Sequence, residues 1–296
     1  MSLIKYSKLR AEISNAREKV LAGSEVLRTK NVDIEYAVKG EGPSTLVLHG
    51  AGGGYDQGLL LGKILLGESY KLVSVSRFGY IRSPIPEDST VRAQANIYNS
   101  LLDHLKIDKV IVVGCSAGGP SALQFTHDYP ERCSALILGS ALTMYRAPGD
   151  KNMFFIKVIH LIQKYDSLYW VFTRFFQSIF LQLIGVSQNV YRRLTLEQKK
   201  LAQEILDVMH PMSLRRKGTL HDSKIRPLDG VAMSKISVPT LIFHAKDDGL
   251  VNYKHAEFSH RNIKQSKLVF FETGGHLLLP QMNSIREQVR VFLKKI

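Results

Sequence analysis

Cysteine is scarce in this chain, which has only Cys115 and Cys133 among its 296 residues. Two cysteines are too few for the disulfide framework that stabilises many small secreted domains. Residues 1–5 also lack the apolar segment of a signal peptide. These absences favour a cytoplasmic protein, and we expect both cysteines to be small buried thiols in a reducing compartment.

Long apolar runs are also missing. The most apolar stretch, residues 153–186, is interrupted by charged side chains at Lys157, Lys164, Asp166 and Arg174. A membrane-spanning helix needs about 20 consecutive and predominantly apolar residues. We therefore expect no transmembrane helix in this stretch.

Acidic residues are in the minority, since 26 Asp and Glu stand against 40 Lys and Arg, which gives a formal net charge of +14. Residues 146–227 alone hold 14 basic and 6 acidic side chains. Such an excess favours an anionic partner. The sequence has no zinc-finger spacing, no RNA-binding signature and no long basic run, so we predict no nucleic-acid partner. Peripheral contact with an anionic membrane surface stays open as an alternative.

What the sequence does contain is an alternation of buried strands and helices. Apolar runs typical of buried strands occupy residues 44–48, 72–75, 109–113, 134–138, 239–245 and 267–271. Helical segments separate most of these runs, and such alternation predicts a parallel sheet covered by helices. Ahead of this sheet we predict a charged helix over residues 1–23 and a hairpin of strands 25–29 and 32–38.

The pattern changes over residues 143–232, where no buried strand is recognisable. Helices are predicted at residues 154–164, 168–183 and 196–209. We therefore divide the chain into a first core part, an all-helical insertion and a second core part: residues 1–142, 143–232 and 233–296. The aromatic side chains of the insertion suit either its own core or the lining of a substrate pocket. The basic run at 215–217 suits a solvated face.

One predicted strand ends in a motif that suits catalysis. The apolar run leads into Gly-Cys-Ser-Ala-Gly at residues 114–118, and a helical segment follows as far as Pro130. A serine on a sharp strand-to-helix turn projects its hydroxyl away from the sheet, and glycines on either side avoid collisions in the bend. The helix N-terminus behind the serine favours negative charge that develops nearby. Ser116 is therefore the candidate nucleophile.

A serine nucleophile needs a base and an acid, and candidates for both follow buried strands late in the chain. His276 lies in the glycine-containing turn after the last predicted strand, and Asp248 follows the strand before it. Sites in such sheets lie at the carboxyl ends of the strands, and the order serine, aspartate, histidine is the one this turn architecture requires. Asp247 and, more remotely, Asp150 are alternatives for the acid. His244 lies within a strand, and we expect it to be buried and satisfied.

A glycine-rich loop at residues 49–54 follows the first buried strand. It matches neither the dinucleotide-binding pattern nor a P-loop, so we expect no cofactor, and we predict no metal ion. An oxyanion loop fits better, with the backbone N–H groups of Ala51 and Ala117 donating to developing negative charge. A tight turn without catalytic function is the alternative. Three polar residues are expected to fasten this loop and the next one rather than bind ligands: His49, Arg77 and Tyr80.

Together these motifs resemble the α/β-hydrolase superfamily from about Glu25 to the C-terminus. The segments that carry the resemblance are residues 49–53, 76–80, 114–119, 247–251 and 274–276. It implies a mostly parallel eight-stranded sheet flanked by helices, with the helical insertion as a cap that sets substrate choice. In this superfamily the acid usually stands three residues before the position of Val251, which favours Asp248. Asn252 and Cys115 stand where proline and histidine are frequent, and neither belongs to the triad.

The sequence thus predicts a serine hydrolase with the triad Ser116, Asp248 and His276 that cleaves a carboxylic ester through an acyl-enzyme. The apolar, aromatic and basic character of the insertion favours a lipophilic, monoacylglycerol-like substrate. Hydrolysis of a C–C bond, or cofactor-free haloperoxidase or lyase chemistry, would use the same residues. A non-catalytic ligand receptor on this scaffold is the alternative from another class of protein.

Overall fold

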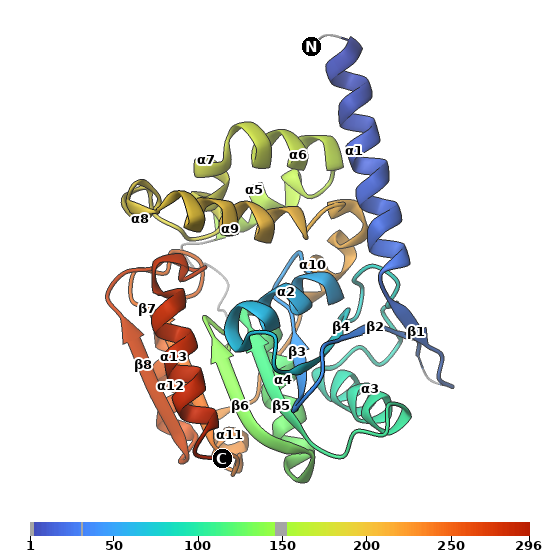
Figure 1. Cartoon of the computed structure of the whole chain (residues 1–296). Helices are drawn as coiled ribbons and strands as arrows, with labels where there is room; N and C mark the ends of the chain where they lie inside the picture. The colour runs from blue at the N-terminus through green and yellow to red at the C-terminus, as the bar shows by residue number, and fades with distance from the viewer. Residues whose placement is uncertain (1–2, 31, 146–152) are drawn as a thin grey trace.

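Eight strands form a single sheet in the computed structural model, which describes residues 3–30, 32–145 and 153–296 (Figure 1). The strands are β1 (Glu25–Leu27), β2 (Ile34–Lys39), β3 (Ser44–Leu48), β4 (Lys71–Val75), β5 (Val110–Cys115), β6 (Cys133–Gly139), β7 (Thr240–Ala245) and β8 (Ser266–Phe271). Their order across the sheet is β1-β2-β4-β3-β5-β6-β7-β8. The β1–β2 and β2–β4 pairs are antiparallel, and the other neighbours are parallel. The predicted mostly parallel, eight-stranded α/β sheet is confirmed.

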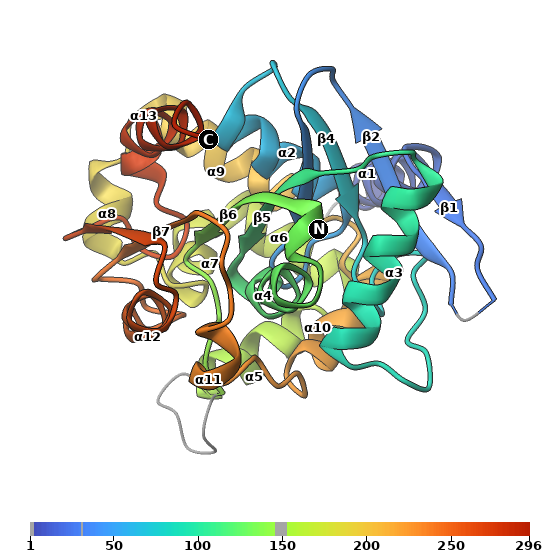
Figure 2. The ribbon, with the colours of Figure 1, turned by 90° about the horizontal axis from the view of Figure 1, so that it is seen from below.

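Helices cover both faces of this sheet. One face carries α2 (Tyr55–Leu66) and α13 (Met282–Leu293), and the other carries α3 (Val91–His104), α4 (Gly119–Asp128) and α12 (Lys254–Asn262) (Figure 2). Successive side chains of a strand enter opposite layers. In β3, Leu46 and Leu48 pack in the layer with α3 and α4, whereas Val47 packs in the layer with α2 and α13. Burial on both faces explains why these strands read as continuous apolar runs.

The chain between β6 and β7 contains helices and loops but no strand in its described part, residues 140–145 and 153–239. Its helices are α5 (Met153–Ile162), α6 (Asp166–Phe175), α7 (Gln177–Leu183), α8 (Gln188–Arg193), α9 (Leu196–Asp207), α10 (Arg216–Asp222) and α11 (Gly230–Met233). Figure 1 shows α5 to α9 as a layer above the carboxyl ends of the strands, whereas α11 lies at the other end of the sheet, against α4 and α12. We refer to α5–α9 as the helical layer.

Two expectations for this region are wrong. Residues 168–183 do not form one helix, because Phe176 leaves the helical conformation and separates α6 from α7. The basic run at 215–217 is not uniformly solvated, because Arg215 is fully buried and its guanidinium binds both carboxylate oxygens of Asp56 at 2.9 and 2.6 Å. A charge that is removed from water needs such a partner.

The first helix, α1 (Leu3–Ala22), stands at the side of the sheet. Its end packs on the core through Val20, which contacts Ala37 and Tyr55. Figure 1 shows the rest of α1 rising past α6, where the Trp170 indole N–H donates to Glu12 at 2.6 Å. Within the described residues, no helix combines the length and the apolar character that crossing a membrane requires.

Candidate active site

The serine motif forms a sharp turn at the carboxyl end of β5. Ser116 has a φ of 51°, a left-handed value that is uncommon outside glycine, and a short 3-10 turn leads from it into α4. The flanking glycines have no room for a side chain. A Cβ on Gly114 would lie 2.5 Å from that of Ala122, and one on Gly118 would overlap the carbonyl oxygen of Leu48. The turn therefore holds Ser116 in a strained conformation of the kind found at functional sites.

Three side chains from three loops form one hydrogen-bonded chain. Oγ of Ser116 lies 2.9 Å from Nε2 of His276, and Nδ1 of His276 lies 2.8 Å from Oδ2 of Asp248. Because the ionised carboxylate can only accept, Nδ1 carries a proton, and Nε2 is left to accept from the serine hydroxyl. The structure thus brings together the three residues that the sequence proposed as nucleophile, base and acid.

The two neighbouring aspartates have different partners. Asp248 faces the ring of His276, whereas Oδ1 of Asp247 accepts from the backbone N–H groups of residues 274–275 at 2.9 and 2.8 Å. Asp247 thereby fixes the turn that carries the histidine. The third candidate, Asp150, lies outside the described residues.

The surroundings of Asp248 keep it ionised. Its side chain is fully buried, and its Oδ1 accepts from the N–H groups of Leu250 and Val251 at 2.8 and 2.9 Å. Burial alone would favour the neutral acid. The charge of His276 and the hydrogen bonds from His244 and His276 outweigh burial, so they hold the pKa of Asp248 well below its usual range. An ionised Asp248 can stabilise a positive charge on the His276 ring.

His244 is a contact of the acid that the sequence did not reveal. Its Nε2 lies 3.1 Å from Oδ2 of Asp248 and 2.9 Å from the carbonyl oxygen of Val251. Since a carbonyl only accepts, Nε2 carries the proton. His244 is buried as expected, but its Nδ1 has no hydrogen-bond partner among the described residues. The one signal in the sequence is its position four residues before Asp248 at the end of a strand.

The glycine-rich loop lies against the serine turn. A Cβ on Gly50 would lie 3.2 Å from the Cβ of Ser116. Ala51 and Ala117 both line the cavity that Ser116 lines. The two proposed oxyanion donors therefore belong to backbone segments that meet beside the serine.

A buried polar cluster supports this loop. His49 donates from Nδ1 to the Gly50 carbonyl at 2.7 Å and accepts at Nε2 from the backbone N–H of Arg77 at 3.1 Å. The Arg77 guanidinium binds the His49 carbonyl and both carboxylate oxygens of Asp222, to which the Tyr80 hydroxyl also donates. Burial and then the charge of Arg77 lower the pKa of His49 well below its ordinary value, so the ring is neutral. The expectation that these residues fasten loops is confirmed, and Asp222 on α10 is the partner that sequence reasoning missed.

Gly185, between α7 and α8, connects the helical segment to the acid and base loops. Its carbonyl oxygen accepts from the N–H of His276 at 3.0 Å and from that of Gly249 at 3.2 Å. Its φ is 86°, and a Cβ there would lie 2.7 Å from the backbone nitrogen of Leu250. Only glycine adopts such a φ readily. The Gly185 carbonyl oxygen therefore fixes both the loop that carries Asp248 and the loop that carries His276. No sequence motif identifies Gly185 as this contact.

A cavity of about 550 Å³ opens beside Ser116. Apolar side chains from α2, α7, α9 and the turns after α9 and β8 dominate its lining, among them Leu61, Ile64, Phe180, Ile205, Met209 and Leu277. The aromatic residues of the helical layer divide between the two expected roles. Tyr169 is fully buried in the core of the layer, whereas Phe180 contributes to both that core and the cavity.

One side of the cavity is polar. Lys157, His160 and Gln163 line it at a spacing of three residues along α5 and the turn that follows it, which places them on one side of this segment. Gln163 is buried beside the glycine-rich loop, His160 is half-buried and Lys157 is exposed. Oε1 of Gln163 has no hydrogen-bond partner among the described residues. A polar track thus runs from the interior to the surface.

Neither cysteine competes with Ser116 as a nucleophile. Both are free thiols, and burial raises the pKa of each to about 12, so both are protonated at neutral pH. Cys133 is buried as expected, whereas Cys115 is only half-buried. Among the described residues, no group of three or more His, Cys, Asp or Glu side chains could hold a metal ion.

A strained serine turn at the carboxyl edge of a mostly parallel sheet, with a hydrogen-bonded histidine and aspartate, defines a class of protein. The profile of the alpha/beta hydrolase fold family matches residues 43–281, and the chain belongs to this family. The protein is accordingly a hydrolase, and its hydrolase-named relative agrees with this assignment.

Similar proteins extend over nearly the whole chain. An uncharacterized hydrolase of Bacillus subtilis, YcgS, is 28% identical over 270 residues, which cover 83% of this chain and 88% of the relative. A proline iminopeptidase of Saccharolobus solfataricus is 26% identical over 279 residues, which cover 88% of each chain. An alpha/beta hydrolase fold protein from Nakamurella multipartita has a solved structure with a TM-score of 0.77 at 24% identity, covering 91% of this chain and 98% of that one.

Proposed function

We propose that the protein cleaves a carboxylic ester through an acyl-enzyme formed on Ser116. The observation that carries the proposal is the unbroken hydrogen-bonded chain from Ser116 through His276 to Asp248 beside a mostly apolar cavity. This arrangement supplies a nucleophile, a base in the required tautomer and an ionised group to stabilise the imidazolium.

The proposed reaction has two halves. Oγ of Ser116 attacks the ester carbonyl while Nε2 of His276 takes its proton, and the N–H groups of Ala51 and Ala117 donate to the oxyanion. His276 then gives the proton to the departing alcohol, which leaves the acyl-enzyme. In the second half, His276 takes a proton from water, the water oxygen attacks the acyl carbon, and the carboxylic acid departs as Ser116 recovers its proton.

The lining of the cavity supports a lipophilic acyl group joined to a polar alcohol. Apolar walls suit an alkyl chain, because burying apolar surface is favourable by about 25 cal/mol per Å². The track formed by Lys157, His160 and Gln163 suits a polar leaving group. The unpartnered Oε1 of Gln163 would accept from a hydroxyl, and leaving a buried oxygen unsatisfied costs about 1–3 kcal/mol. A monoacylglycerol-like ester has both parts.

A peptide with a free amino terminus, the substrate that the name of the iminopeptidase relative suggests, suits this cavity less well. Recognition of an ammonium group calls for a carboxylate. Asp222 is the one carboxylate among the described lining residues, and it is already bound by Arg77 and Tyr80. The charges of the lining therefore favour the ester.

The outer surface of α5–α7 supports delivery of the substrate at an anionic membrane. Large apolar side chains are exposed there at Leu161, Tyr165, Phe175, Phe176 and Ile179. Scattered exposed apolar residues are normal on a protein surface, but a group on adjoining helices is typical of an interaction site. Lys157 and Lys164, both exposed on the same segment, would face anionic headgroups.

The catalytic assignment is tested with a fluorophosphonate probe. We expect the wild type to be labelled and Ser116→Ala to be unlabelled, with ester turnover lower by roughly 10⁶-fold. Ser100→Ala is a matched control, because Ser100 is exposed on α3 and should leave labelling intact. Undiminished turnover by Ser116→Ala would refute the assignment. A wild type without labelling or turnover would support the receptor alternative, and faster cleavage of a diketone than of any ester would support the C–C hydrolase.

The substrate class is tested with esters of increasing acyl length and with monoacylglycerols. We expect kcat/KM to rise with chain length, and Gln163→Leu to lower kcat/KM roughly tenfold for monoacylglycerols but not for methyl esters of the same acids, because only the former present a hydroxyl. Anionic vesicles should increase the rate on long-chain substrates. A preference for short, soluble esters without any effect of vesicles would contradict this part of the proposal.

A further inference from the structure

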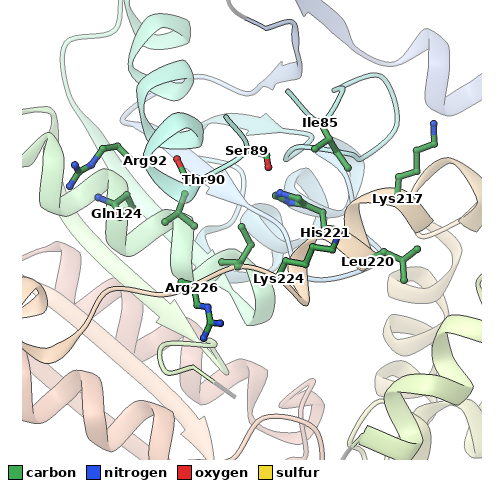
Figure 3. Close-up of a pocket in the computed structure, with 12 residues that line it drawn as sticks. Ile85, Ser89, Thr90, Arg92, Gln124, Lys217, Leu220, His221, Lys224 and Arg226 are labelled. Atoms are coloured by element: carbon green, nitrogen blue, oxygen red, sulfur yellow. The ribbon is translucent and has the colours of Figure 1, made fainter. Parts of the chain in front are cut away.

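A second cavity, of about 750 Å³, lies between the start of α3 and the end of α10 (Figure 3). It is lined by residues 89–92 on one side and by residues 217–226 on the other, and Ile225 also lines the cavity beside Ser116. The two cavities therefore share the segment that follows α10 as a wall. The proposed ester hydrolysis assigns no role to this second cavity.

The charged side chains around this cavity are all basic. They are Arg92, Lys217, Lys224 and Arg226, and the described lining contains no carboxylate. Figure 3 shows Arg92 and Lys217 at opposite ends of the cavity, with Lys224 and Arg226 along a further side. Arg92 lies 3.4 Å from Asp128 outside the cavity, whereas Lys217 and Lys224 have no ion-pair partner among the described residues. Arg226 stacks on the ring of Tyr145 at 3.7 Å. Lys217 and Lys224 are thus the two cations of this lining without an ion-pair or ring partner among the described residues.

Two polar groups lie at the centre of the cavity: the N-terminus of α3 and the ring of His221. α3 begins here, and because Thr90 caps only the N–H of Ala93, the N–H groups of Val91 and Arg92 remain available to an anion. The Asp88 carboxylate precedes the helix and accepts from the N–H and the hydroxyl of Thr90 at 3.2 and 2.8 Å. His221 is 7% exposed, and its ring projects from α10 toward Ser89 and the middle of the cavity (Figure 3). The ring makes a hydrogen bond with the Ser89 backbone, but its Nδ1 has no partner among the described residues. A buried nitrogen without a partner needs an explanation.

We propose that this cavity binds a small organic molecule that carries a phosphate group. A phosphate monoanion has acceptor oxygens for the helix N-terminus and the rim cations, and it has a hydroxyl that can donate to the free Nδ1 of His221, a combination that a single carboxylate lacks. The apolar side chains of Ile85, Leu220 and Ile225 suit the carbon part of the ligand. Binding does not require Ser116, so the site stands independently of the ester hydrolysis.

The test is a titration followed through the His221 ring in protein labelled with ¹³C-histidine, with the signal assigned by its loss in His221→Phe. The probes are inorganic phosphate, glycerol 3-phosphate, and phosphatidylcholine vesicles with and without phosphatidic acid. We expect a saturable shift that is unchanged in Ser116→Ala and weakens with added salt. Saturation by glycerol 3-phosphate identifies a soluble ligand, whereas saturation only by phosphatidic acid vesicles identifies a lipid headgroup.

The control compares two double variants with equal loss of charge. Lys224→Gln with Arg226→Gln should weaken binding tenfold or more, since each lost charge-assisted contact is worth at least about 1.4 kcal/mol, or a factor of ten. Lys39→Gln with Lys264→Gln changes two exposed lysines outside the cavity and should leave the affinity unchanged. No saturable shift with any of the probes, or equal weakening in both double variants, would overturn the proposal.

Discussion

Asp248 shows how a few atoms set the chemistry of a residue. It accepts from two ring nitrogens, those of His276 and His244, and from the N–H groups of Leu250 and Val251. Every one of these donors favours the carboxylate over the acid. The carboxylate therefore stays ionised although its side chain is fully buried, and the His276 ring keeps the tautomer that accepts from Ser116.

Replacing His244 should remove a hydrogen bond to the Asp248 carboxylate and leave substrate binding unchanged. In His244→Leu we expect kcat to fall roughly 10- to 100-fold with little change in KM, because a hydrogen bond to a charged group is worth about 1.5–3 kcal/mol. His244→Gln should recover most of the rate, since its amide nitrogen can donate from nearly the same position. The measurement is kcat and KM on one ester for both variants, and equal losses in both would show that His244 only fills space.

His210 should make stability depend on pH. It is buried against Tyr169, its ring nitrogens have no partner among the described residues, and burial lowers its pKa to about 4. A histidine in the unfolded chain has a pKa of about 6.5. Between about pH 6.5 and pH 4, His210 is therefore protonated in the unfolded chain but not in the folded protein. The free energy of unfolding consequently falls as the pH falls through this range.

We expect His210→Phe to remove this part of the pH dependence, which amounts to about 3 kcal/mol in the free energy of unfolding between about pH 6.5 and pH 4. Urea unfolding of both proteins at pH 7.5 and pH 4.5 measures it. Other buried histidines, such as His49, contribute equally to both proteins and cancel in the comparison. An identical loss of stability in the variant would contradict the prediction.

At the scale of elements, strands were predictable and helix interruptions were not. Each buried strand is a short apolar run, because it is covered on both faces. The break between α6 and α7 at Phe176 contains no glycine or proline, so no helix-breaking residue in the sequence marks it. Gly185 is similar, because its role depends on the distant loops that carry Asp248 and His276.

Gly185→Ala should disturb the acid and base loops together. The added Cβ would meet the Leu250 backbone at 2.7 Å in addition to the strain of a φ of 86°. We expect kcat to fall at least tenfold and the melting temperature to drop. Gly67→Ala is a matched control, because its φ of 83° imposes the same strain but nothing lies within 4 Å of the added Cβ. It should cost roughly 1–2 kcal/mol of stability and leave kcat unchanged. Equal kcat in both variants would contradict the positioning role.

At the scale of the whole molecule, two buried ion pairs tie the α10 region to the core. Arg77 after β4 binds Asp222, and Arg215 binds Asp56 at the start of α2. The partners are 145 and 159 residues apart in the chain. These pairs hold the wall between the two cavities, so the position of that wall depends on charges that no local segment contains.

Removing one partner of such a pair should be costly. Asp222→Asn leaves the buried Arg77 without its counter-charge, and we expect a loss of about 3–5 kcal/mol in the free energy of unfolding, measured with urea. Glu287→Gln breaks an exposed pair with Arg290 and should leave the free energy of unfolding essentially unchanged, because water screens such a pair. Similar effects of the two substitutions would show that Asp222 does not hold the wall.

The sequence by itself determined the sheet and the candidate triad. Each buried strand is a local apolar run, because hydrophobic burial selects apolar side chains there. The glycine turns and the order of Ser116, Asp248 and His276 can also be read along the chain. The tertiary structure decided which aspartate meets the histidine, because Asp247 and Asp248 differ by one position and point to different partners. It also decided the buried pairs of Arg77 and Arg215, since a charge is buried only where the fold places an opposite charge beside it.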